Sequence, residues 1–175
     1  MHRMPFQYLV LICALIISSV ANARGIYQEP EQFLNETFNG NVPKPGVIWI
    51  TSNIRPVVKR ILGHKPSALR IRYWKQEGKI AWILEEIGKD KPITTGIVIN
   101  KGKIERVKVL VFRESRGWEI RHHFFTRQFI DATLKPDHEL DRSIDGISGA
   151  TLSVRAIRKL SRLALYLSNT LTQQQ

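Results

Sequence analysis

Cysteine is nearly absent from this chain, since Cys13 is the single one in 175 residues. The bulky Ile12 stands immediately before it, where a lipoprotein site needs a small residue, so lipidation is not expected. If the N-terminal segment is removed on export, the remaining chain has no thiol. That excludes disulfides, iron–sulfur ligation and a cysteine nucleophile, and it leaves a hydrophobic core as the source of stability.

A hydrophobic run long enough to cross a bilayer, which takes about 20 residues, is also lacking near the N-terminus. The apolar run there, Tyr8 to Val20, is shorter. Arg3 precedes the run, and Ala21-Asn22-Ala23 follows it with small residues at the positions that a signal peptidase reads. We interpret residues 1–23 as a cleaved secretory signal and expect a periplasmic protein. An uncleaved N-terminal anchor is the alternative.

Acidic residues are few, with 15 Asp plus Glu against 27 Lys plus Arg. Residues 1–23 carry Arg3 and no acid, so removing them lowers the formal net charge from +12 to +11. Such a balance favours anionic partners, namely a membrane surface or an acidic redox protein. Export argues against nucleic acid. The plain alternative is a soluble surface with no anionic partner.

Four segments alternate apolar and polar residues in the manner of strands. Short turns separate them, and Asn100-Lys101-Gly102-Lys103 predicts a tight hairpin. A further strand is predicted over residues 117–121. The result is an antiparallel meander of about five strands. The four alternating segments are Leu69–Trp74, Lys79–Ile87, Ile93–Asn100 and Ile104–Phe112.

Helical signals flank the predicted sheet. Residues 24–47 are rich in Pro, Asn, Gln and Glu, which predicts a loosely ordered lead-in. Thr51-Ser52 and the apolar residues after it predict a capped helix that ends at Gly63. A short helix is expected over residues 122–129. We therefore divide the chain into a signal (1–23), a lead-in with one helix (24–66) and one main domain (67–175).

The C-terminal region has a helical period. Its apolar residues fall on one side and its basic residues on the other, which predicts an amphipathic helix packed on the sheet. The expected class is α+β, with one layer of helices against the antiparallel sheet. The apolar side holds Val154, Ile157, Leu160, Ser161, Ala164 and Leu167, and the basic side holds Arg155, Arg158, Lys159 and Arg162.

The segment most informative about chemistry, Asp145-Gly146-Ile147-Ser148-Gly149-Ala150-Thr151, stands directly before that helix. Asp145-Gly146 is a turn dipeptide, and Ser148 is a candidate helix cap. Gly149 and Ala150 leave the backbone open to approach. Thr151 falls in or beside the first helical turn, where unpaired N–H groups and the helix dipole favour an anion such as phosphate. Many capped helices share these features without binding anything.

This run resembles the flavinylation motif of the FMN-binding domain family, Asp-Gly-x-Ser-Gly-Ala-Thr followed shortly by Ser or Thr. The family includes periplasmic flavoprotein subunits of sodium-pumping NADH:quinone oxidoreductases and of Rnf-type complexes. The resemblance implies that a flavin transferase uses FAD to join FMN, through its phosphate, to the hydroxyl of Thr151. It also implies that Asp145, Gly146, Ser148, Gly149 and Ala150 form the cofactor-binding segment. The resemblance extends over roughly residues 67–167.

A second, weaker match is the stretch Glu114-Ser115-Arg116-Gly117-Trp118. It resembles a Glu-Thr-Pro-Gly-type loop near the flavin in this family, although Arg116 replaces the proline. Glu114 and Trp118 are therefore candidate flavin contacts. An aromatic residue such as Trp118 in a strand is otherwise a core residue.

Two other interpretations concern single residues. Without the resemblance, Thr151 would be read as an ordinary residue at a helix start, and the complete run is what favours the flavin anchor. His122-His123 suggests a metal or haem ligand pair, but adjacent residues in a strand point to opposite faces, so no metal site is expected.

The function that follows is an exported carrier of covalent FMN, which relays electrons between a membrane-bound donor and a periplasmic acceptor. As a carrier or subunit it would work within an oxidoreductase system. The alternative is a non-redox basic module that docks to membrane lipid or to an acidic partner protein.

Overall fold

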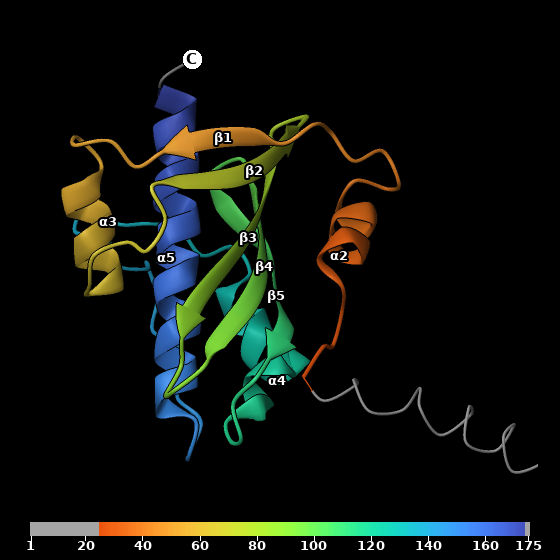
Figure 1. Cartoon of the computed structure of the whole chain (residues 1–175), viewed down its shortest axis with the longest axis vertical. Helices are drawn as coiled ribbons and strands as arrows, with labels where there is room; N and C mark the ends of the chain where they lie inside the picture. The colour runs from red at the N-terminus through yellow and green to blue at the C-terminus, as the bar shows by residue number, and fades with distance from the viewer. Residues whose placement is uncertain (1–24, 174–175) are drawn as a thin grey trace, which may run out of the picture.

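The computed structural model describes residues 25–173 and contains a five-stranded antiparallel sheet. The predicted signal segment lies outside the described residues. Consecutive strands are neighbours throughout, so the sheet is a meander, and helices pack against it (Figure 1). The α+β class is thus confirmed. The strands are β1 (Gly46–Trp49), β2 (Arg70–Gln76), β3 (Lys79–Ile87), β4 (Pro92–Asn100) and β5 (Lys103–Phe112).

Tight turns join the central strands. The turn between β4 and β5 has Lys101 at φ 49° and Gly102 at φ 77°, which is the conformation of two-residue hairpins. Glu77 and Gly78 adopt similar positive angles between β2 and β3. The hairpin predicted at residues 100–103 is therefore confirmed.

The helical elements are α2 (Pro30–Thr37), α3 (Arg55–Leu62), α4 (His123–Thr126) and α5 (Thr151–Gln173), with the 3-10 turns η1 (Trp118–Arg121) and η2 (Arg127–Phe129). Helix α3 ends at Gly63 as predicted, in the left-handed conformation. It begins at Arg55, with Ile54 at the N-cap, where the Ile54 carbonyl accepts the Val58 N–H at 3.0 Å. No side chain caps this end, so the cap predicted at Thr51-Ser52 was wrong.

The lead-in is more ordered than its composition predicts, and this expectation was wrong. Strand β1 pairs with β2, and α2 packs on the sheet through Phe33. The lead-in thus holds two helices and one strand. Composition misled here because Phe33, Leu34 and Phe38 are buried among strand residues distant in the sequence.

Helices cover both faces of the sheet, so the single helical layer was also wrong. Helices α3 and α5 pack on one face and α2 on the other (Figure 1). Residues 93–99 of β4 are all buried, as expected of a strand covered on both faces. On the α2 side, a Cβ added to Gly96 would lie 2.6 Å from the Phe33 ring, so only glycine allows this approach.

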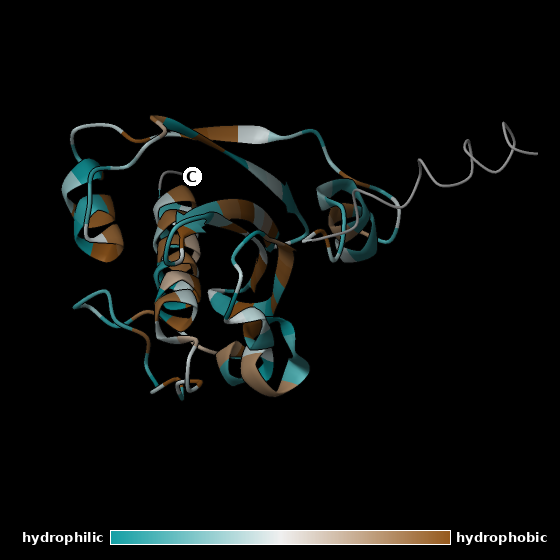
Figure 2. Cartoon of the chain, turned by 60° about the horizontal axis from the view of Figure 1, so that its bottom comes forward, coloured by the Kyte–Doolittle hydropathy of each residue, from teal (hydrophilic) through white to brown (hydrophobic). Residues whose placement is uncertain are grey.

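Helix α5 carries most of the larger core. The apolar residues predicted for its buried side are buried, and Trp82 Nε1 donates a hydrogen bond to Ser168 Oγ at 2.9 Å. Helix α3 turns its hydrophobic side toward α5 and its hydrophilic side outward (Figure 2). Within residues 25–173, no helix combines the length and the apolar character needed to cross a membrane.

The strand predicted over residues 117–121 was wrong, because this stretch is the 3-10 turn η1. Gly117 has φ 87°, which breaks the extended conformation after β5. A short helical stretch then follows, as predicted, in α4 and η2.

Candidate functional site

The motif segment forms an open turn that leads into α5. Ser148 and Gly149 are the turn residues, and Gly149 has φ 79°. The Ala150 N–H bonds to the Ile147 carbonyl at 2.9 Å, and the helix begins at Thr151. A Cβ added to Gly149 would meet nothing within 4 Å. The backbone before Thr151 is therefore accessible from outside.

The first turn of α5 has no side-chain cap. The Ala150 carbonyl accepts the Val154 N–H at 2.9 Å, which places alanine at the N-cap. The prediction that Ser148 caps the helix was wrong, since its hydroxyl lies two residues too early. Within residues 25–173, no acceptor is found for the N–H groups of Thr151, Leu152 and Ser153. These groups and the helix dipole favour an anion.

Thr151 is exposed at this helix start. Nothing in the described part of the chain hydrogen-bonds to its hydroxyl. The oxygen is consequently available both to a modifying enzyme and to a phosphoester bond.

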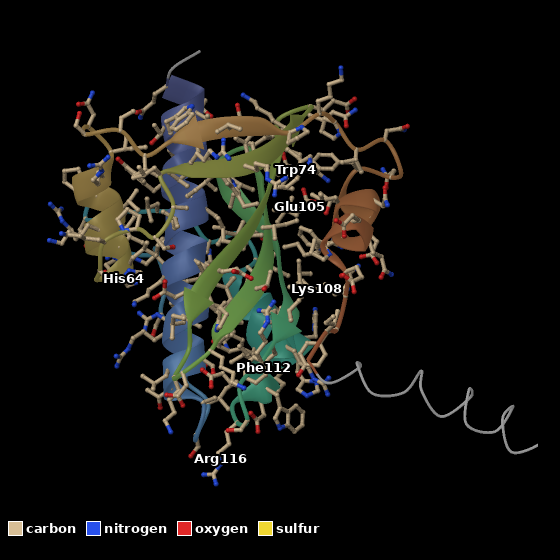
Figure 3. All side chains as sticks on the ribbon, viewed as in Figure 1. His64, Trp74, Glu105, Lys108, Phe112 and Arg116 are labelled. Atoms are coloured by element: carbon tan, nitrogen blue, oxygen red, sulfur yellow. The ribbon has the colours of Figure 1, made fainter. Side chains whose placement is uncertain are left out.

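A cleft of about 560 Å³ lies beside Thr151. Three segments distant in the sequence line it: residues 149–153, residues 114–116 and Lys89. The structure thus brings together the two stretches singled out in the sequence. Arg116 projects at the end of the molecule where α5 begins (Figure 3). Two cations, Lys89 and Arg116, and one carboxylate, Glu114, line the cleft, so the lining is cationic on balance. Lys89 also lies 3.7 Å from the Asp90 carboxylate.

Glu114 binds the turn between β3 and β4. Its Oε1 accepts the backbone N–H groups of Lys89, Asp90 and Lys91 at 2.5, 2.7 and 3.0 Å. Partial burial opposes ionisation, but these three bonds outweigh it and lower the pKa of Glu114. The carboxylate lines the cleft, and its hydrogen bonds fix the turn that carries Lys89.

Gly117 joins the 114–118 loop to the motif. A Cβ at this position would lie 2.7 Å from Ser153 Oγ and 3.3 Å from the Ala150 Cβ. The positive φ and the close contact both require glycine. This packing sets the distance between the two main walls of the cleft.

Trp118 lies on the surface and is not among the residues that line the cleft. It is 43% exposed, so the interpretation of Trp118 as a core residue was wrong, and its contact with flavin stays a prediction. Its ring packs edge-on against His122, and the Arg121 guanidinium lies 5.0 Å from its centroid. His122 also stacks on Phe124.

Asp145 and Gly146 stand further from the cleft and shape the approach to the turn. The Asp145 N–H donates to Gln128 Oε1 at 2.7 Å, and Asp145 and Gly146 are both exposed. The neighbouring Ile144 is buried and anchors the segment to the core. These residues set the path of the chain into the turn.

Sequence reasoning missed two cleft cations. Lys89 was read only as a turn residue, and Arg116 only as a departure from a motif proline.

The basic residues of α5 differ in their contacts. Lys159 pairs with buried Glu86 at 2.9 Å and Arg162 with Glu139 at 2.8 Å, whereas Arg155 is exposed.

Residues 88–166 match the family model of the FMN-binding domain. That interval contains the β3–β4 turn, the loop at residues 114–117 and the motif before α5, which are the parts that form the cleft. Neither the curated proteins nor the solved structures contain a match to this chain.

Proposed function

We propose, from the match of residues 88–166 to the FMN-binding domain family, that the protein carries FMN covalently on Thr151 and relays electrons outside the cytoplasm. The observation that carries the proposal is the exposed, unbonded Thr151 hydroxyl at an uncapped helix start inside a cationic cleft.

The residues present fit the phosphate end of FMN. The free N–H groups of Thr151, Leu152 and Ser153 offer hydrogen bonds to phosphate oxygens. Lys89 and Arg116 offset the negative charge of the group. The cleft volume lies within the range of about 300–1,000 Å³ typical of ligand sites.

Attachment requires little chemistry from this chain. The Thr151 oxygen would attack the FMN phosphorus of FAD in a flavin transferase, forming the phosphoester as the phosphoanhydride breaks and AMP leaves. The hydroxyl proton passes to the transferase. The open turn at Ser148 and Gly149 supports access to that enzyme, because no side chain at Gly149 obstructs it.

Once attached, FMN supplies the redox chemistry, and the protein supplies position and electrostatics. Lys89 is held in place because Glu114 fixes its turn. We place the donor in the membrane and the acceptor in the periplasm, in line with the signal-like residues 1–23 and the high positive charge.

The test is co-expression with a flavin transferase, followed by denaturing electrophoresis and mass spectrometry. Wild-type protein is expected to give a flavin-fluorescent band and an FMN-sized mass gain on the Thr151 peptide. Thr151→Val, which removes the hydroxyl, is expected to abolish both. Ser143→Ala is the matched control, since it removes an exposed hydroxyl just before the motif, and it should label fully. A dark wild-type band beside a labelled reference flavoprotein would refute the covalent attachment.

Intact-mass analysis of the exported protein tests the location. Recovery in the periplasmic fraction with a mass that begins at Arg24 is expected. A full-length mass in the cytoplasmic fraction would contradict the export proposal.

A further inference from the structure

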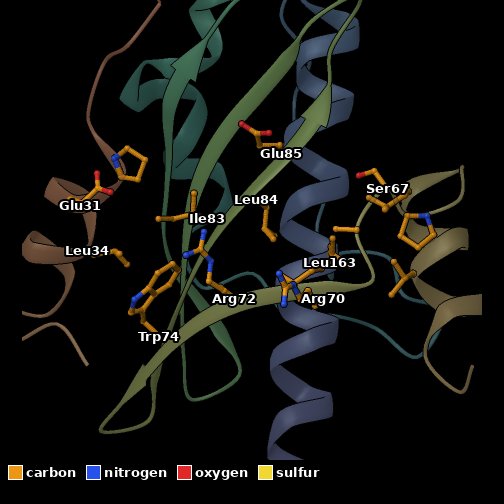
Figure 4. A pocket seen from close by; sticks show the side chains of 16 residues that line it. Glu31, Leu34, Ser67, Arg70, Arg72, Trp74, Ile83, Leu84, Glu85 and Leu163 are labelled. Atoms are coloured by element: carbon orange, nitrogen blue, oxygen red, sulfur yellow. The ribbon is translucent and has the colours of Figure 1, made fainter. Parts of the chain in front are cut away.

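A second cavity lies away from Thr151, where strands β2 and β3 separate. The pairing of β2 with β3 ends at Tyr73 and Trp82, whereas β3 continues to Ile87 along β4. The first half of β2 pairs with β1 instead. A fork therefore opens in the sheet, and a cavity of about 460 Å³ occupies it (Figure 4).

The inner wall of this fork cavity is apolar. Leu84 of β3, Leu163 of α5 and Val58 and Leu62 of α3 line it, and all four are buried residues of the core. Trp74 lines the opposite side, beside α2. A ligand with an apolar body would therefore bury that part against the core.

Two arginines lie at the mouth of the cavity. Arg70 and Arg72 are exposed, lie two residues apart on the same face of β2, and make no ion pair or hydrogen bond within residues 25–173. Both flank the cavity in Figure 4. Glu31 and Glu85 also line the cavity, but Glu85 pairs with Arg113 at 3.6 Å and accepts a hydrogen bond from Thr94 Oγ1. Arg70 and Arg72 are thus balanced by Glu31 alone among the lining carboxylates. The mouth therefore has an excess of available positive charge.

The fork is closed at both ends, which limits the kind of ligand. The paired parts of β2 and β3 close one end. At the other end, His64 of the α3–β2 loop bonds Glu86 of β3 at 3.0 Å, and Lys159 bonds the same carboxylate at 2.9 Å. An extended peptide cannot run through such a space, so the shape favours a compact ligand.

We infer that this cavity binds a compact amphiphilic anion, with an apolar body against Leu84 and Leu163 and a carboxylate or phosphate on Arg70 and Arg72. The site is separate from the Thr151 cleft and shares none of its lining residues. The inference does not depend on flavin attachment, so it can be tested in protein without flavin.

The test uses the whole exported chain carrying Thr151→Val, so that flavin does not contribute. Anilinonaphthalene sulfonate serves as the fluorescent probe, and octanoate, octyl phosphate and octanol compete with it. We expect one saturable site per chain. We expect octanoate or octyl phosphate to displace the probe, and octanol to bind at least about tenfold more weakly, because charge-assisted hydrogen bonds are stronger than neutral ones. Comparison of the two anions separates a carboxylate ligand from a phosphate ligand.

Variants distinguish this site from general attraction to a basic protein. The double variant Arg70→Gln and Arg72→Gln should weaken anion binding about tenfold or more. Arg155→Gln with Arg158→Gln is the matched control, since it removes the same charge from exposed positions on α5 and should bind within about twofold of the parent. Ala68→Trp keeps the charge and should block the mouth, because Ala68 is an exposed lining residue.

Equal weakening in both double variants would overturn the inference, as would unaltered binding in Ala68→Trp. Displacement of the probe only at concentrations at which the competitor forms micelles would also overturn it. Circular dichroism of each variant establishes that the fold is retained, and either of the two site variants alone is sufficient for the decision.

Discussion

The Glu114 carboxylate offers the sharpest test of how the cleft is held together. One oxygen, Oε1, accepts three backbone N–H groups of the β3–β4 turn at 2.5, 2.7 and 3.0 Å. A single hydrogen bond contributes a net of about 0.5–1.5 kcal/mol, and more when one partner is charged. Because three donors share one partly exposed oxygen, we expect Glu114→Ala to lower the free energy of unfolding by about 2–3 kcal/mol. Glu114→Gln keeps an acceptor but loses the charge, and should cost about 1 kcal/mol.

The loss should depend on pH. The pKa of Glu114 is lowered in the folded protein, so its carboxylate stabilises the fold above the unfolded-state pKa. That stabilisation disappears as the pH falls through the folded-state pKa. The difference between wild type and Glu114→Gln should therefore be largest near neutral pH and shrink toward pH values of about 3.

Urea unfolding followed by tryptophan fluorescence measures these differences across that pH range. Glu31→Gln is the matched control, since Glu31 is an exposed carboxylate for which no hydrogen bond or ion pair is found within residues 25–173. A free-energy loss in Glu114→Gln that stays constant from neutral to acidic pH would refute the role of the charge. A loss below about 0.5 kcal/mol in Glu114→Ala would refute the three-bond account altogether.

Three further predictions concern other positions. Gly117→Ala should lower the free energy of unfolding by about 1–3 kcal/mol and reduce flavin labelling in the gel assay. The reason is that the φ of 87° and the distance of 2.7 Å from an added Cβ to Ser153 Oγ exclude a side chain. Full labelling at wild-type stability would contradict this. Hydrogen bonding to the Lys65 carbonyl, with a smaller effect of Glu86, raises the pKa of His64, so its stabilisation is complete below the unfolded-state pKa and is lost as the pH rises through the folded-state pKa. His64→Gln should thus be most destabilising in mildly acidic urea titrations and least in alkaline ones, and the reverse order would rule out this role. Gly96→Ala should lower the melting temperature through overpacking on Phe33, and an unchanged temperature would show that α2 shifts without cost.

Periodicity was enough to predict the central sheet and α5. Strands β3 and β5 alternate over part of their nine and ten residues, β4 is a nine-residue run buried from 93 to 99, and α5 keeps one apolar side over its length. Such patterns are local, so they can be recognised without knowing the partner. The hairpin at Lys101-Gly102 is local in the same sense, because its backbone angles favour glycine.

The lead-in could not be predicted in this way. Strand β1 is four residues long, and it is ordered by pairing with β2 more than twenty residues later. Phe33 of α2 packs against Gly96, a contact that neither segment reveals alone. Tertiary contacts outweighed the composition of these residues.

The candidate site was predictable at Thr151 and only in part around it. The motif is contiguous, so its position before a helix could be read directly. Glu114 stabilises the turn through a hydrogen bond to Lys89, which lies 25 residues away in the sequence. The cationic residues Lys89 and Arg116 belong to no recognisable motif. Trp118 was misplaced because a five-residue stretch carries too little pattern to separate a strand from a 3-10 turn.

The cleft is formed by segments that are far apart in the chain and are therefore synthesised at different times. Lys89, Glu114 and the turn at Gly149 come together only when α5, which ends at Gln173, has docked on the sheet. A growing or truncated polypeptide lacks this assembled pocket. Cofactor loading that requires the intact cleft would therefore be a late event in the maturation of the protein, and the attached flavin would mark molecules whose C-terminal helix has been completed and packed.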